Sequence, residues 1–118
     1  MFMKVERHRT ASKRDVIAIY ILAQSPRSQA KCWAVIHALE LYGLDVHPKF
    51  SKKLAGYKNL WELRIATETQ HRILFTITIN NVAVLLHAFN KKTQKTPLKE
   101  IELAFYRQRN YETTKKSS

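Results

Sequence analysis

The chain is poor in the residues on which several protein classes depend. Cys32 is its only cysteine, so no internal disulfide and no cysteine-rich zinc site can form. Two glycines and three prolines exclude collagen-like and Gly/Pro-rich linker architectures. The longest uninterrupted apolar run, 16–23, is far shorter than the roughly 20 residues of a membrane span. With no apolar signal core at the N-terminus, we expect no membrane segment and a location in the reducing cytoplasm.

Acidic residues are also scarce relative to basic ones. The 118 residues contain 21 Lys and Arg against 9 Asp and Glu, which gives a formal net charge of +12 and a pI near 10.1. Between His47 and Lys99 there are ten bases and two acids, so this stretch carries +8 of the total. A polyanion is therefore the expected partner, and its binding surface should be regional.

The apolar content is high enough for one folded domain. Forty-five per cent of the residues are hydrophobic and 10% are aromatic, which argues against an intrinsically disordered chain. We assign 1–112 to a single domain of the usual size and 113–118 to a flexible polar tail.

Two helices are predicted in the N-terminal half. Ser12 is a plausible N-cap for a helix over 12–23, and Ser25-Pro26 is a typical start for a second helix that ends near Gly43. The connection is so short that the helices should form an antiparallel hairpin. The expected buried stripe of the second helix is Ala30, Trp33, Ala34, His37 and Leu41.

The C-terminal half changes to a strand pattern. Alternation begins at Leu60, and two apolar, β-branched runs at 72–79 and 82–89 are joined by a predicted two-residue turn at Asn80-Asn81. Thr96-Pro97 predicts a third helix to about Asn110, and 2–7 is a weak candidate for an edge strand. The predicted fold is α+β, with an N-terminal helical hairpin and a C-terminal helix packed on one face of a small antiparallel sheet.

The residues argue against most hydrolytic chemistries. The nine acids are scattered, so a magnesium site with several carboxylates is not expected. The five histidines lack zinc spacing, and no nucleophile elbow or phosphate-binding glycine loop is present. We therefore expect no metal and no cofactor.

Metal-free cleavage of RNA remains compatible with this composition. RNA supplies its own nucleophile, the 2′-hydroxyl, so cations and a proton acceptor suffice to position it and to stabilise the transition state. Arg64 and Arg72 lie near the facing ends of consecutive predicted strands. The candidate catalytic residues are Arg64, Arg72, His87, Lys91 and Lys92; the candidate RNA-binding residues are Lys49, Lys52, Lys53, Lys95 and Phe89.

Several segments, in this order, carry a resemblance to a known family. They are KLAG at 53–56, LWELRI at 60–65, HRILF at 71–75, LLHAFNKKTQKTP at 85–97 and EIELA at 100–104. Over roughly 12–111 the chain resembles the phage-derived HigB-like toxins of the RelE/ParE superfamily. One departure is His71, where the family more often has tyrosine.

The resemblance implies a RelE-like fold and a toxin of a type II toxin–antitoxin system. It implies an endoribonuclease that cleaves mRNA, usually on the translating ribosome, and a cognate antitoxin, for which we expect a small helix-turn-helix protein. Two alternatives remain open: a ParE-like inhibitor of a topoisomerase, and an RNA-binding module without catalysis.

Overall fold

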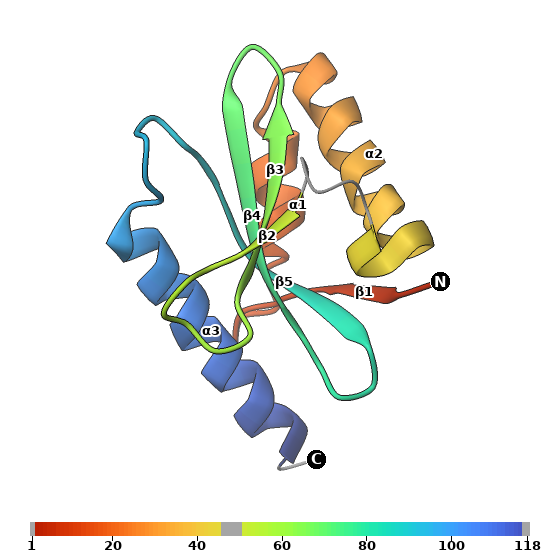
Figure 1. The fold of residues 1–118 in the computed structure, drawn as a ribbon, viewed down its shortest axis with the longest axis vertical. Helices are drawn as coiled ribbons and strands as arrows, with labels where there is room; N and C mark the ends of the chain where they lie inside the picture. Colours follow the sequence, from red (N-terminus) through yellow and green to blue (C-terminus); the bar gives the residue numbers. More distant parts are fainter. Residues whose placement is uncertain (1, 46–50, 117–118) are drawn as a thin grey trace.

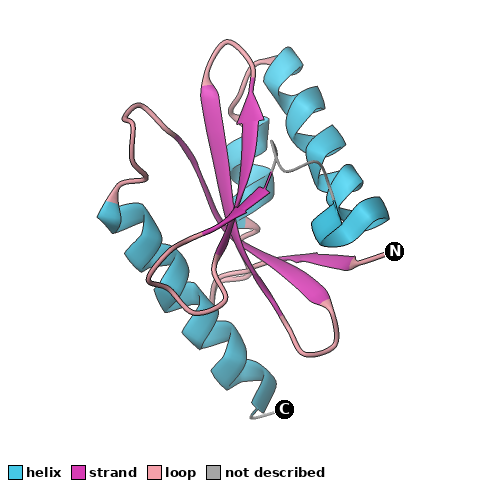
Figure 2. Cartoon of the chain, in the orientation of Figure 1, coloured by secondary structure: helices cyan, strands magenta, loops and turns pink. Residues whose placement is uncertain are grey.

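The computed structural model describes residues 2–45 and 51–116. Helices and strands both contribute, which confirms the predicted α+β class (Figure 1, Figure 2). In chain order the elements are β1 (Lys4–Arg7), α1 (Val16–Leu22), α2 (Pro26–Tyr42), the short 3₁₀ helix η1 (Gly43–Asp45), β2 (Ser51–Lys53), β3 (Trp61–Ala66), β4 (Gln70–Ile77), β5 (Val82–Asn90) and α3 (Leu98–Lys116).

The five strands form one mixed sheet in the order β1-β5-β4-β3-β2. The pairs β2–β3, β3–β4 and β4–β5 are antiparallel, but β1 runs parallel to β5, so the expectation of a purely antiparallel sheet was wrong. The weak edge strand expected at 2–7 is confirmed as β1. Strand β2 was not predicted, because its three residues, Ser51 to Lys53, are all polar.

The helices cover both faces of the sheet, and the expectation that they share one face was wrong (Figure 1). One buried cluster joins α1 and α2 to alternate residues of the strands, including Ile73 and Phe75. The other joins Ile101 and Ala104 of α3 to the intervening residues, including Leu74. Since consecutive residues of β4 are apolar, both faces of the sheet have to be removed from water.

The helix starts agree with prediction at α2 but not at α1. The Ser25 hydroxyl accepts a hydrogen bond from the Ser28 amide, and Pro26 opens α2. At α1 the N-cap is Asp15, not Ser12: the Asp15 carboxylate accepts from the Ala18 amide at 3.0 Å. Ser12 instead shares a hydrogen bond with the Thr10 hydroxyl in the preceding turn.

Two boundaries in the C-terminal half also differ from prediction. β4 ends at Ile77, so the connection to β5 spans 78–81, with Asn81 at a φ of 62°. α3 continues past Asn110 to Lys116 and so includes part of the segment assigned to the polar tail.

The buried face of α2 differs from the predicted one, since the helix buries Ser28, Cys32, Val35, Ile36 and Leu39.

Candidate functional site

Arg64 and Arg72 lie directly opposite each other on β3 and β4. Residues paired across neighbouring strands point to the same face of the sheet, and Leu74, two residues after Arg72, packs in the cluster beneath α3. The two arginines therefore share the face that α3 covers. Glu62 precedes Arg64 by two residues on β3 and belongs to the same face.

Arg72 is buried, and its guanidinium has a hydrogen-bond partner on one side and an ion-pair partner on the other. Its side chain donates a hydrogen bond through Nη1 to the His71 carbonyl at 2.9 Å, and its Nε lies 3.3 Å from Oε1 of Glu62. Burial lowers the pKa of Arg72 from its usual value, the Glu62 carboxylate opposes that shift, and the charge of Arg64 adds to it. An arginine keeps its charge despite such a shift, so Arg72 presents a fixed cation.

The loop between β5 and α3 is attached to the sheet at both of its ends, at the start of β4 and at the start of β3. At its start the Lys91 amide donates a hydrogen bond to the Gln70 carbonyl at 2.7 Å. At its end the Thr96 hydroxyl donates to Oε2 of Glu62 at 2.6 Å. Both ends of the loop are thus attached to β3 and β4, and Lys91 and Lys92 share a concave surface with Arg72.

A hollow of about 540 Å³ opens between this loop and the start of β4. Its lining residues are Gln70, Arg72, Lys91, Lys92, Thr93 and Gln94. Three of the predicted site residues thus converge on one concave surface. The cations and side-chain amides suit an anionic ligand with several acceptor oxygens, such as a phosphodiester.

Sequence reasoning missed Gln70, Thr93 and Gln94. A signal for Gln70 was present, since it precedes Arg72 by two residues on a strand and so shares its face. Thr93 and Gln94 lie within the same segment as the predicted lysines. A loop pattern does not indicate which of its side chains face a hollow.

The predicted RNA-binding lysines are dispersed. Lys52 lies opposite Glu62 on β2 and so belongs to the face of the arginine pair. Lys53 belongs to the other face, where its ammonium group lies 5.9 Å from the centre of the Trp61 ring. Lys95 is exposed in the loop but does not line the hollow. Lys49 lies outside the described residues.

His87 and Phe89 share the face of Arg72 but are enclosed by the protein. Phe89 is only 6% exposed, and its ring stacks on that of His87 with centroids 5.5 Å apart. The structure thus places Phe89 in the packing of the sheet, where it is not available to stack on a base. In β5 it lies opposite Arg72, whereas His87 lies two residues further from the hollow.

His87 is occupied by two residues of α3. Its Nε2 lies 3.1 Å from the Glu100 carboxylate, and its Nδ1 lies 3.3 Å from Nη1 of Arg107. Burial lowers the pKa of His87, the hydrogen bond and charge of Glu100 oppose the shift, and Arg107 adds to it. These contacts hold the side chain beneath α3, and His87 does not line the hollow.

His71, the departure from the family pattern, is itself buried and points away from the arginine pair into a partly buried polar network. Tyr20 donates its hydroxyl hydrogen to the Asn90 side chain at 2.9 Å, and its oxygen lies 2.7 Å from Nδ1 of His71. The other ring nitrogen, Nε2, lies 2.9 Å from the Thr69 hydroxyl. Because the His71 ring faces away from the arginine pair and does not line the hollow, its geometry does not support a role in the chemistry there.

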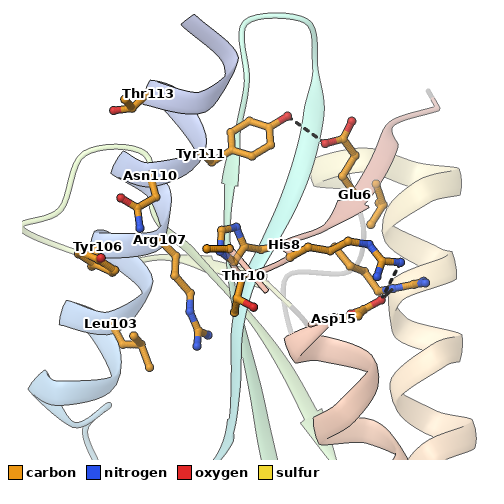
Figure 3. Close-up of a pocket in the computed structure, with 14 residues that line it drawn as sticks. Glu6, His8, Thr10, Asp15, Leu103, Tyr106, Arg107, Asn110, Tyr111 and Thr113 are labelled. Atoms are coloured by element: carbon orange, nitrogen blue, oxygen red, sulfur yellow. Dashed lines mark hydrogen bonds and ion pairs between the residues drawn. The ribbon is translucent and has the colours of Figure 1, made fainter. Parts of the chain in front are cut away.

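A larger hollow, of about 960 Å³, lies between β1 with its following loop and the middle of α3 (Figure 3). It contains none of the predicted site residues. Several of its charged and polar groups are paired with one another: Arg7 with Asp15 at 2.8 Å, and the Tyr111 hydroxyl with Glu6 at 2.9 Å.

Residues 2–45 and 51–116 contain no group of three or more His, Cys, Asp or Glu side chains arranged to hold a metal ion. Over the same residues, no helix has the length and apolar content needed to span a bilayer. The fold and the site define a small α+β protein with a cationic hollow at one end of its sheet.

Comparison with known proteins places this chain in a family. Residues 20–109 match the family described as phage derived protein Gp49-like (DUF891). Because the match covers well over half of the 118 residues, the chain belongs to this family, which consists of toxins of toxin–antitoxin systems. Membership implies an antitoxin partner. No curated protein matches the chain.

Proposed function

We propose that this toxin is a metal-independent endoribonuclease that cleaves mRNA. The observation that carries the proposal is the convergence of Arg72, Lys91 and Lys92 on one hollow, with Arg64 directly opposite Arg72. A toxin family and a net charge of +12 make a nucleic acid the natural target. The scattered carboxylates favour chemistry by cations over chemistry by a bound metal.

In this mechanism the RNA contributes the nucleophile. The 2′-hydroxyl loses its proton and attacks the adjacent phosphorus, the bond to the 5′-oxygen breaks, and that oxygen takes up a proton. The products are a 2′,3′-cyclic phosphate and a 5′-hydroxyl. Arg64 and Arg72 neutralise the charge that develops on the phosphorane-like transition state. Lys91 and Lys92 lie where they can contact the same phosphate and take part in proton transfer.

The resemblance to HigB-like toxins supports two further parts of the proposal. Cleavage takes place on the translating ribosome in the cytoplasm, where mRNA is presented as a single strand. The antitoxin is a small helix-turn-helix protein, and the neighbouring reading frame is the first place to look for it.

Primer extension on translated messages after induction tests the proposal. New 5′ ends within coding regions, absent when Arg64→Ala is induced, are the expected result. Growth arrest with intact messages and an inhibited topoisomerase would support the ParE-like alternative instead. RNA binding without growth arrest would indicate a non-catalytic binding module.

A further inference from the structure

Glu62 is a buried acid within a cationic site. Its side chain is among the few charged ones that the described residues bury, at 3% exposure. One carboxylate oxygen lies 3.3 Å from Nε of Arg72, and the other accepts a hydrogen bond from Thr96 at 2.6 Å. A single carboxylate on β3 therefore contacts both the neighbouring strand and the far end of the 91–97 loop.

A negative charge at this position works against binding an anion. It costs free energy to bury, and it reduces the positive potential that attracts a phosphate. It does, however, place an opposite charge 3.3 Å from Nε of Arg72, which also lies opposite the like charge of Arg64. Its contacts thus favour a role in orientation over a role in affinity.

We propose that Glu62 is a positioning residue. It fixes the Arg72 guanidinium through the ion pair and fastens the loop through Thr96, so that Arg72, Lys91 and Lys92 keep one arrangement around the hollow. Glu62 does not line the hollow and acts through these neighbours. The inference rests on the proposed ribonuclease function for its kinetic consequences.

Glu62→Gln tests the ion pair, since glutamine keeps the shape and an oxygen for Thr96 but removes the charge. We expect kcat for RNA cleavage to fall roughly 10- to 100-fold, the size of effect that small misplacements of reacting groups produce. KM should stay unchanged or fall, because a negative charge has been removed from the vicinity of the RNA. A wild-type kcat would overturn the proposal. The proposal would also be overturned if thermal melting showed that the loss of activity is explained entirely by a smaller amount of folded protein.

Two further variants make the test specific. Thr96→Val leaves the ion pair but releases the far end of the loop, so KM should rise as Lys92 loses its fixed position. Glu68→Gln is the matched control: Glu68 lies on the same β3–β4 hairpin, but its carboxylate accepts hydrogen bonds from Ser25 and Ser28 on the other face. It should leave kcat and KM unchanged, and an equal effect of both glutamine variants would contradict a specific role for Glu62.

A spectroscopic measurement separates this inference from the proposed function. The ¹⁵N-resolved signal of the Arg72 Nε–H should shift in Glu62→Gln and stay in place in Glu68→Gln, whether or not the protein cleaves RNA. A wild-type protein without ribonuclease activity would refute the proposed function, and the Arg72 signal would still report whether Glu62 positions the guanidinium. An Arg72 signal unmoved by Glu62→Gln would overturn the inference itself.

Discussion

Arg64 and Arg72 lie directly opposite each other on neighbouring strands, a placement in which like charges repel. Such a pair of like charges destabilises the sheet. The buried Glu62 carboxylate beside Arg72 offsets part of that repulsion. Two arginines on one face of a sheet can contact one phosphate from two directions, which neither arginine alone can do.

The first prediction concerns this arginine pair. Arg64→Ala should reduce RNA cleavage by roughly 100-fold or more, as the loss of one donor to a transition-state anion does. Arg64→Lys should restore only part of the activity, because an ammonium group does not reproduce the two-pronged guanidinium contact. Growth arrest on induction and cleavage of purified ribosome-bound messages measure the effect. Full toxicity of Arg64→Ala would refute the assignment.

Arg72 requires a different substitution from Arg64. Arg72→Ala leaves the buried Glu62 carboxylate without its ion pair, and breaking a buried pair in this way costs about 3–5 kcal/mol of stability. Loss of activity in that variant would not distinguish chemistry from unfolding. Arg72→Lys keeps the charge, so it should retain a cooperative melt while cleavage falls at least tenfold. Wild-type cleavage by Arg72→Lys would contradict a bidentate contact.

The second prediction concerns metal ions. Cleavage should continue in excess EDTA when the RNA substrate is kept intact, because the proposed steps use only side chains and the 2′-hydroxyl. End analysis should find a 2′,3′-cyclic or 3′-phosphate on one fragment and a 5′-hydroxyl on the other. A strict requirement for magnesium in the chemical step, or a 3′-hydroxyl product, would rule out the mechanism.

The third prediction uses the salt dependence of RNA binding. Each lysine that contacts a phosphate of a single strand contributes roughly −0.7 to the slope of log affinity against log salt, so the Lys91→Ala/Lys92→Ala double variant should flatten the slope by about 1.4 units. Lys95→Ala should change it less, since Lys95 does not line the hollow. Fluorescence anisotropy with a labelled oligonucleotide gives the slopes.

Lys115→Ala/Lys116→Ala serves as the control for charge alone. It removes the same number of cations at the end of α3, and it should leave the slope nearly unchanged. If the slope flattened in this control but not in the loop variant, the RNA would bind elsewhere on the protein.

The fourth prediction is a loss of stability in mild acid. Burial lowers the pKa of His71 below its usual 6.5; the Glu68 charge opposes that shift, and the Arg72 charge adds to it. The unfolded chain therefore binds a proton that the native ring resists. The free energy of unfolding should fall as the pH drops through 6.5 toward the native pKa, by at most about 1.4 kcal/mol per pH unit for one histidine.

His8 and His87, whose pKa values burial also lowers, contribute in the same direction. Urea titrations between pH 5 and 8 measure the dependence. His71→Gln should reduce its slope by removing one titrating group. An unchanged slope in that variant would mean that His71 accepts a proton in the folded protein as readily as in the unfolded chain.

Local structure could be predicted from the sequence where the backbone preference of a single residue determined it. Ser25-Pro26 predicted the start of α2, and the positive φ of Gly43 and Asn81 marks places where those residues are well suited to end a helix or turn a chain. The sequence was a poorer guide to which side chains are buried. In the run 16–23 every residue is apolar, so periodicity could not identify Ile17 and Ile21 as the buried pair.

Residue types and their spacing along the chain were enough to predict the α+β class and to nominate the arginines and the basic loop. Which of these residues meet depends on how the helices and strands pack. This packing placed α3 on the second face, since both faces of β4 are apolar, and a bulge between Leu74 and Phe75 shifts the pairing with β5 so that His87 and Phe89 share the face of Arg72. The contact between Glu62 and Thr96, 34 positions apart, depends on that packing, and no local pattern encodes it.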